Sequence, residues 1–338
     1  MKASVICFSD AGARLSIRIA DILDVSTSDI HSTSKFAGKY GFSAHEKVSD
    51  DVGDLFREDD ALIFVCACGI AVRSVAPYLK DKTSDPAVIV IDDQGRYVIP
   101  ILSGHIGGAN DLARFLAERI SALPVITTAT DGSGRFSCDS WAVKHGCAIS
   151  SMDTAKKISA EILVRDIPVC SEYPLPDILP AGLFAGDSGD IGIYIGIKKN
   201  TPYRETLRLI PKIVSLGIGC RRGISKERIC DAVTSVFADN GLDTLAVRGI
   251  ASIDVKKDEI GLTEFARDLG VPAAFYSAGE LDSVEGEFEE SEFVRKTVGV
   301  GNVCERAAAF GGGKLIVRKT AVDGVTVAAA AAEWRVEF

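Results

Sequence analysis

Apolar residues in the first third of the chain follow two different spacings. Short apolar runs typical of buried strands occupy residues 4–9, 61–67, 86–92, 96–102 and 124–129. Apolar residues at helical spacing lie between these runs, in residues 13–23, 69–79 and 109–120. Strands that alternate with helices across short glycine-bearing links predict a largely parallel sheet covered by helices. The turn at residues 93–95 predicts one antiparallel hairpin within that sheet.

The same patterns divide the whole chain into three regions. We expect an N-terminal α/β domain over residues 1–127 and a small middle subdomain over residues 128–211. Prolines and glycines predict a loop over residues 170–186, and residues 198–211 are expected to lead out of the subdomain. Strands and helices alternate again from residue 212, which predicts a second α/β domain over residues 212–338. The predicted fold class is therefore α/β, with two domains of mainly parallel or mixed sheets joined by the middle subdomain.

The net charge and the hydropathy of the chain indicate which classes of binding partner are disfavoured. The chain has 338 residues and a formal net charge of −9. Proteins that bind nucleic acids or anionic membranes usually present a basic surface, so both partners are disfavoured. The apolar run after Met1 is too short for a secretory signal, and no later run reaches transmembrane length. We therefore expect a cytoplasmic protein that contacts neither nucleic acid nor membrane.

The nine cysteines are scattered along the chain. Most are expected to be ordinary buried thiols of a reducing compartment. Only Cys66 and Cys68 are close in sequence, and on one strand both would point to the same face. A zinc site needs more ligands than these two, so no protein-bound metal is predicted.

The turn after residue 102 is the first place where the sequence indicates chemistry. Its candidate substrate contacts are Ser103, Gly104, Gly107, Gly108 and Asn110. The glycines permit close backbone approach, and the following helix start favours an anion. A tight turn with Asn110 or Asp111 as helix cap would also explain this pattern. His105 lies on a loop, which favours catalysis or substrate contact, although histidines that only bond their own loop are common.

Two more groups of polar residues follow predicted strands. Gly69 and Arg73 come after the strand at residues 61–67, and Thr128 and Asp131 lie near the end of the next predicted parallel strand. An ordinary turn would also explain the aspartate. Because ligands in open α/β sheets bind beyond the carboxyl ends of strands, we expect these groups and the glycine-rich turn to converge on one cleft.

The last domain carries a second set of candidates. Gly219 ends the strand predicted at residues 212–219 and Arg221 follows it, and backbone donors beside a guanidinium suit a carboxylate or another anion. The run "GIGCRRG" is one residue too long for a dinucleotide fingerprint, and "AFGGGK" is not a P-loop. A solvated turn would equally explain the charged link at residues 254–259. The remaining candidate substrate contacts are Ser252, Lys256, Gly301 and Asn302.

Together these segments resemble the CbiG family. The resemblance is carried in the first domain by residues 69–113, which include "SGHIGGANDLA", and by residues 124–142. In the last domain it is carried by "LGIGCRRG", "ASIDVKKDEIGL", "SEFVRKTVGVGNVCERAA" and "LIVRKTAVDGVTVAAA". The last domain is also similar to CobE proteins. Where the family usually has small residues, "GVGNVCER" has an asparagine and a cysteine.

The resemblance implies the hydrolysis of cobalt-precorrin-5A in anaerobic cobalamin biosynthesis. Water would open the δ-lactone of this cobalt corrinoid, and acetaldehyde would leave to give cobalt-precorrin-5B. Cobalt would arrive within the substrate, so no protein-bound cofactor is implied. His105 is then the candidate general base and Asp131 the runner-up. Neighbouring enzymes of the pathway are candidate partners, and a homodimer stays open.

Two alternatives belong to other classes of protein. A non-catalytic carrier would bind a labile corrinoid tightly and release no acetaldehyde. A nucleotide-regulated α/β module would use the glycine turns for phosphates. The incomplete phosphate motifs make this second alternative the weaker one.

Overall fold

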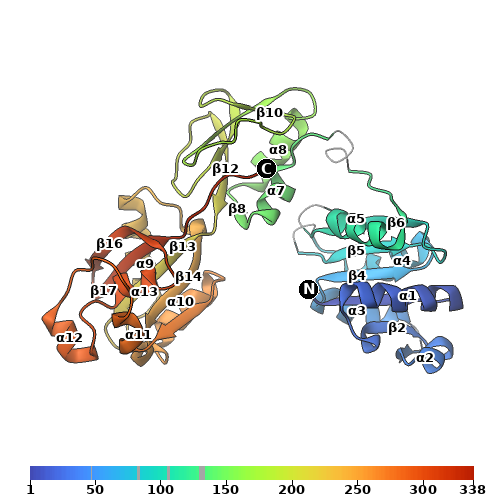
Figure 1. Cartoon of the computed structure of the whole chain (residues 1–338), viewed down its shortest axis with the longest axis horizontal. Coiled ribbons are helices and arrows are strands. Elements are labelled where there is room, and N and C mark those ends of the chain that lie inside the picture. The colour runs from blue at the N-terminus through green and yellow to red at the C-terminus, as the bar shows by residue number, and fades with distance from the viewer. Residues whose placement is uncertain (47, 82–83, 105–106, 129–133) are drawn as a thin grey trace. The chain divides into compact units, whose positions relative to one another are not determined.

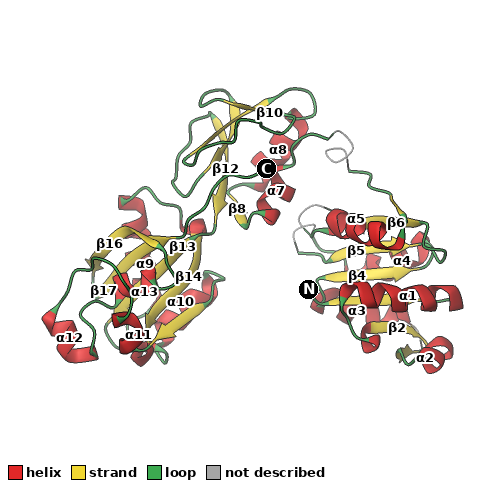
Figure 2. Ribbon diagram, viewed as in Figure 1, coloured by secondary structure: helices red, strands yellow, loops and turns green. Residues whose placement is uncertain are grey.

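The computed structural model describes residues 1–46, 48–81, 84–104, 107–128 and 134–338 of the chain. The chain forms two compact units, unit 1 over residues 1–140 and unit 2 over residues 141–338 (Figure 1). Both units contain sheets with helices packed against them, which confirms the predicted α/β class (Figure 2). Across the part of the chain that is described, no helix combines the length and the apolar character needed to cross a membrane.

The described residues of unit 1 form one sheet of order β3-β2-β1-β4-β5-β6-β7. Its strands are β1 (Ala3–Cys7), β2 (Ile30–Thr33), β3 (Ser43–His45), β4 (Ala61–Val65), β5 (Ala87–Ile91), β6 (Tyr97–Leu102) and β7 (Leu123–Pro124). Its helices are α1 (Asp10–Leu23), η1 (Thr27–Asp29), α2 (Ser34–Tyr40), α3 (Val48–Glu58), α4 (Cys68–Val75), η2 (Ala76–Tyr78) and α5 (Ala109–Ile120), where η marks a short 3₁₀ helix. Neighbouring strands pair in parallel except β5 and β6, which form the predicted antiparallel hairpin.

The centre of this sheet explains why the apolar runs fold as strands. Every residue of β1, β4 and β5 is buried, because helices cover both faces of a mostly parallel sheet. Two predicted strands are shorter than expected. Strand β4 ends at Val65 and α4 begins at Cys68, so Cys66 and Cys68 do not share a strand. Strand β7 has only two residues, since it pairs with β6 alone at the edge of the sheet.

The middle region is a second sheet, of order β10-β9-β11-β12-β8. Its elements are α7 (Cys138–Lys144), β8 (Cys147–Ile149), α8 (Met152–Glu161), β9 (Ile167–Ser171), β10 (Leu183–Ala185), β11 (Ile191–Ile195) and β12 (Glu205–Pro211). The loop predicted at residues 170–186 is therefore wrong at both ends, where β9 and β10 pair with each other. Residues 198–211 do not lead out of the subdomain, because β12 pairs with both β11 and β8.

The remainder of unit 2 forms a sheet of order β15-β14-β13-β17-β16. Its strands are β13 (Val214–Cys220), β14 (Val247–Ile253), β15 (Ala273–Tyr276), β16 (Lys314–Val322) and β17 (Val325–Ala331). Its helices are α9 (Lys226–Asp239), η3 (Thr244–Ala246), η4 (Asp254–Lys256), α10 (Ile260–Asp268), α11 (Ala278–Asp282), α12 (Glu292–Val298) and α13 (Cys304–Ala309). Strands β13, β14 and β15 are parallel, whereas β17 runs antiparallel to both β13 and β16.

The two faces of this sheet are covered in different ways. Alternate residues of β13, including Leu216 and Ile218, pack with α9 and α10 in the larger core. On the opposite face α13 lies directly on the sheet, and a Cβ at Gly217 would be only 1.7 Å from the carbonyl oxygen of Cys304. Glycine at this position is thus required by the close approach of a helix to the strand. This contact places the start of α13 beside the carboxyl end of β13.

The last residues of the chain leave the sheet. A strand is predicted over residues 325–336, but β17 ends at Ala331. Trp334 instead packs edge-on against Trp141, with 6.3 Å between ring centroids, and against Tyr173. The indole N–H of Trp141 donates a hydrogen bond to the carbonyl oxygen of Glu337 at 2.6 Å. These aromatic contacts tie the end of the chain to the middle region of unit 2.

Candidate functional site

The hairpin of unit 1 separates candidates that were expected to meet. Because β5 and β6 are antiparallel, Leu102 at the end of β6 lies beside the start of β5. Val65, at the end of β4, lies beside the end of β5. Gly69 and Arg73 therefore lie beyond the carboxyl ends of β4 and β5. The glycine-rich turn lies beyond the opposite ends of these strands. The expectation of a single cleft is wrong for these two residues, because only strands that run parallel bring their carboxyl ends to one edge.

The glycine-rich turn after β6 is closed by its own side chains. A Cβ at Gly107 would lie 2.4 Å from the Cβ of Ser103, and one at Gly104 would lie 2.8 Å from the Oδ1 of Asn110. Ser103 has a φ of +54° and donates its hydroxyl to a backbone carbonyl just before β5. Asn110 is 3% exposed and donates its amide to the hydroxyl of Thr128 at 3.1 Å. The turn thus brings Asn110 to Thr128 and packs Ser103, Gly104 and Gly107 within itself, so internal packing already accounts for these residue types.

The other candidates of unit 1 are Gly108, Gly69, Arg73, His105 and Asp131. Gly108 has a φ of +74°, and no atom of the described residues lies within 4 Å of a Cβ built on it. The guanidinium of Arg73 folds back over the first turn of α4, 3.5 Å from a Cβ built on Gly69. The two predicted catalytic residues, His105 and Asp131, lie outside the described residues.

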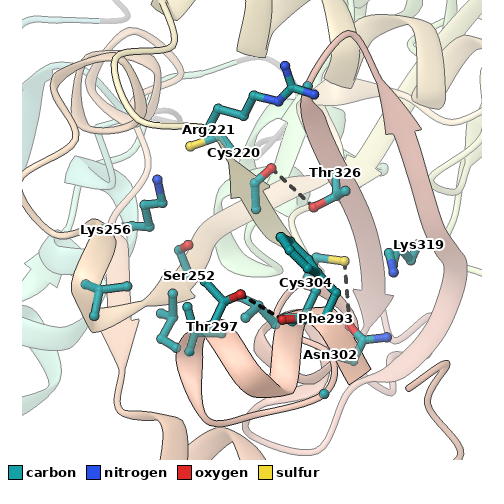
Figure 3. Close-up of a pocket in the computed structure, with 18 of the residues that line it drawn as sticks. Cys220, Arg221, Ser252, Lys256, Phe293, Thr297, Asn302, Cys304, Lys319 and Thr326 are labelled. Atoms are coloured by element: carbon teal, nitrogen blue, oxygen red, sulfur yellow. Dashed lines mark hydrogen bonds between the residues drawn. The ribbon is translucent and has the colours of Figure 1, made fainter. Parts of the chain in front are cut away.

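In unit 2 the predicted contacts share one pocket (Figure 3). Its volume is about 570 Å³, which is within the usual range for ligand sites of about 300–1,000 Å³. It lies beyond the carboxyl ends of β13 and β14, where α/β sheets commonly bind ligands. All six candidates from the sequence line it, namely Gly219, Arg221, Ser252, Lys256, Gly301 and Asn302.

The pocket is basic although the protein is acidic. Its charged lining residues are Arg221, Arg222, Lys256 and Lys319, and the described lining includes no aspartate or glutamate. Lys256 is paired with Glu259, with 3.4 Å between Nζ and Oε2. No described carboxylate lies within 4.0 Å of the other three cationic groups. Three positive charges are therefore available to an anionic ligand, and carboxylates suit them.

Two of the polar residues in the wall are committed to internal hydrogen bonds. The hydroxyl of Ser252 is fully buried and donates to the carbonyl oxygen of Ile218 at 2.6 Å. The side-chain amide of Asn302 donates to the Glu305 carboxylate at 2.8 Å. The Oδ1 of Asn302 accepts the backbone N–H of Glu305. These bonds fix the wall of the pocket, so the groups free to bind a ligand are mainly the cations and the apolar surface.

Apolar side chains complete the lining, and the sequence did not single them out. Phe293 is 78% exposed and Val255 is 57% exposed, yet both line the pocket. Val294 and Val298 join them from α12, a helix that buries none of its residues. Lys319 was missed too, because its strand β16 shows only an ordinary alternation of charged and apolar residues.

Two thiols also line the pocket. Burial raises the pKa of Cys220 and raises that of Cys304 to about 11. Both therefore stay protonated near neutral pH, where only the thiolate is a strong nucleophile. The pocket binds through charge and apolar contact, and it offers no activated cysteine. Four of the nine cysteines are buried, namely Cys7, Cys66, Cys138 and Cys304, so the prediction that most are buried is wrong.

Comparison with known proteins identifies the family to which the chain belongs. Residues 50–131 match the family model described as "Cobalamin synthesis G N-terminal", and residues 214–330 match "Cobalamin synthesis G C-terminus". The chain is thus a protein of the cobalamin synthesis G class, with both of its characteristic regions. It is 35% identical to the cobalt-precorrin-5A hydrolase of Salmonella typhimurium over 96% of each chain. It is 33% identical to the cobalt-precorrin-5A hydrolase of Priestia megaterium, over 81% of this chain and 79% of that protein.

A solved structure of CobE, described as a protein from the cobalamin (vitamin B12) biosynthetic pathway, is also similar. It is 31% identical, with a TM-score of 0.34 over 37% of this chain and 93% of that chain. The chain belongs to the CbiG family, which confirms the resemblance seen in the sequence.

Proposed function

We propose that this chain is a cobalt-precorrin-5A hydrolase of anaerobic cobalamin biosynthesis. It opens the δ-lactone of its substrate with water and releases acetaldehyde, which leaves cobalt-precorrin-5B. Membership of the CbiG family supports the reaction, since relatives named for it match nearly the whole chain. The observation that carries the proposal is the pocket of unit 2, which is basic and apolar in a protein with a net charge of −9.

The substrate class fits this combination of charge and apolar surface. A cobalt corrinoid of this kind is a broad, largely apolar ring whose side chains end in carboxylates. Long-range attraction cannot hold such an anion on an acidic protein, so local cations must do so. Each charge-assisted hydrogen bond from Arg221, Arg222 or Lys319 would contribute about 1.5–3 kcal/mol. Cobalt belongs to the substrate, so the proposal needs no cofactor from the protein.

The chemistry needs a proton acceptor and a proton donor in turn. In the first step water adds to the lactone carbonyl, the ring C–O bond breaks, and the departing oxygen takes up a proton. In the second step that new hydroxyl loses its proton, a C–C bond breaks to give acetaldehyde, and the ring carbon is protonated. His105 is our candidate for both transfers and Asp131 is the runner-up, because both are titratable residues of the segments that match the family.

Acetaldehyde release tests the proposal directly. Purified protein is mixed with cobalt-precorrin-5A, and acetaldehyde is measured by its reduction with alcohol dehydrogenase and NADH. One equivalent of acetaldehyde per corrinoid consumed is expected over many turnovers. A corrinoid that binds tightly and returns unchanged would overturn the hydrolase and support the carrier alternative. Thermal stabilisation by a nucleotide and none by a corrinoid would support the nucleotide-regulated module.

A further inference from the structure

Helix α12 lines the pocket, and only its last residue, Val298, packs against a described hydrophobic core. It runs from Glu292 to Val298 and contains no buried residue. Surface helices normally press an apolar stripe against the core of their protein. Here Phe293 and Val294 line the pocket instead, while Val298 lines the pocket and also packs against the core around Leu281. The hydroxyl of Thr297 donates to the carbonyl oxygen of Phe293 at 2.7 Å, which leaves its methyl group for apolar contact.

The segment that carries α12 is nevertheless firmly attached. Arg306 is largely buried and donates to three backbone carbonyls of residues 281–284 and to the carboxylate of Glu290 at 2.8 Å. The backbone N–H of Ser291 donates to Gly301, where a Cβ would lie 1.5 Å from the Oε2 of Glu290. The exposure of Phe293 is therefore built into the fold, since the base of its helix is held from both sides.

The charges around Phe293 indicate what covers it. Figure 3 shows Arg221 and Lys319, which have no described carboxylate partner, on two sides of the pocket with Phe293 between them, and the ion-paired Lys256 on a third side. A ligand complementary to this arrangement has a flat apolar centre and carboxylates spread around its edge. A small carboxylate without an apolar ring would pair with the cations but leave the apolar side chains of α12 exposed to water.

We propose that α12 is the platform for the ring of the corrinoid, with Phe293 as the specificity-determining residue that rests against its face. The inference rests on the proposed function for the identity of the ligand. The ring supplies an apolar surface for Phe293 and Val294, which pack against no described core, while the cations hold the carboxylates. Phe293 thus distinguishes a corrinoid from small carboxylates that carry the same charge.

The test compares two probes on the full-length protein. Cobyrinic acid is a cobalt corrinoid with free carboxylates, and tricarballylate is a small tricarboxylate without a ring. In Phe293→Ser the affinity for cobyrinic acid, titrated by absorbance, should fall about tenfold, because an aromatic contact is lost. The affinity for tricarballylate, measured by calorimetry, should stay the same. Lys319→Met should weaken both probes, because it removes a charge that both use.

Phe184→Ser is the matched control, since Phe184 is 48% exposed on β10 and does not line the pocket. It should change neither affinity. The melting temperature of Phe293→Ser should match that of the wild type, because its side chain is 78% exposed. Unchanged affinity for cobyrinic acid, or an equal loss for both probes, would overturn the role of α12. The acetaldehyde assay judges the hydrolase separately, so the two proposals fail by different measurements.

Discussion

Lys256 and Glu259 form an ion pair at the wall of the pocket, with 3.4 Å between Nζ and Oε2. The other oxygen of Glu259 accepts the backbone N–H of Gly223, so this carboxylate joins the turn after β13 to the link after β14. Arg221, in the same turn, has no such carboxylate partner among the residues described. The pocket therefore contains one cation that is already paired and others that are ready for a ligand.

Arg221→Ala should weaken the binding of cobyrinic acid by about ten- to a hundredfold, because one charge-assisted hydrogen bond is worth about 1.5–3 kcal/mol. Arg221→Lys should recover only part of the affinity, since the planar fork of the guanidinium is lost. Absorbance titration measures both variants. Arg228→Ala, an exposed change on α9 outside the pocket, is the control. Normal affinity with a lowered melting temperature would assign Arg221 to stability alone.

Lys256→Met should lower the stability of unit 2 more than Arg221→Ala does. The substitution leaves the Glu259 carboxylate, whose side chain is 10% exposed, without its cation. We expect a loss of about 1–3 kcal/mol in the free energy of unfolding, below the full cost for a completely buried pair. The double variant Lys256→Met/Glu259→Gln should regain part of this loss in urea denaturation. Additive losses in the double variant would show that the pair is not coupled.

Gly217→Ala should be among the most destabilising small changes in the chain. The added Cβ would lie 1.7 Å from the carbonyl oxygen of Cys304, and neither backbone can move without separating α13 from the sheet. We expect a loss of about 3 kcal/mol or more in urea denaturation. Gly279→Ala in α11 is the control, because its built Cβ meets no atom of the described residues within 4 Å. It should be neutral or stabilise by up to about 1 kcal/mol. Similar stability of the two variants would contradict the packing of α13 described here.

Tryptophan fluorescence should report a pH-dependent loss of stability at His145. Its ring stacks on Trp141, with 4.7 Å between centroids, and both tryptophans of the chain lie in this cluster. Burial and then Lys144 lower the pKa of His145, against a smaller opposing effect of Glu337. The neutral ring is thus favoured by folding. Stability should be complete above the ordinary pKa of about 6.5 and fall as the pH drops towards the lowered value in the folded protein.

The measurement is the free energy of unfolding followed by tryptophan emission between about pH 8 and pH 5. His145→Gln should flatten the dependence in this window, since glutamine does not titrate. An unchanged slope in the variant would place the responsible group elsewhere.

His105→Ala should reduce acetaldehyde turnover by about 10²–10⁴-fold, the usual contribution of a general acid–base residue. Corrinoid affinity should change little, because the cations proposed to hold the substrate are untouched. Glu118→Gln, on the exposed surface of α5, is the matched control and should turn over normally. Turnover near the wild-type rate in His105→Ala would remove the histidine from the mechanism and leave Asp131 as the candidate.

The sequence by itself determined the elements with strong periodicity. The buried runs of β1, β4 and β13 and the amphipathic helix α5 lie where the apolar spacing predicts them, because this spacing follows from local backbone geometry. The turn at residues 93–95 likewise predicted the β5–β6 hairpin. Six residues that line the pocket of unit 2 were also singled out, four of them because they end or follow the parallel strands β13 and β14, and Gly301 and Asn302 because they precede a helix.

Only the tertiary structure decided which of these positions meet. It placed Gly69 and the turn at Gly107 at opposite edges of one sheet, because β6 runs against β4 and β5. It brought Lys319 of β16 and Phe293 of α12 to the pocket that contains Arg221. Such neighbours depend on strand order and on helix packing between segments far apart in sequence. Local hydrophobic spacing carries no record of those pairings, so the chemistry of the pocket became visible only once the chain was folded.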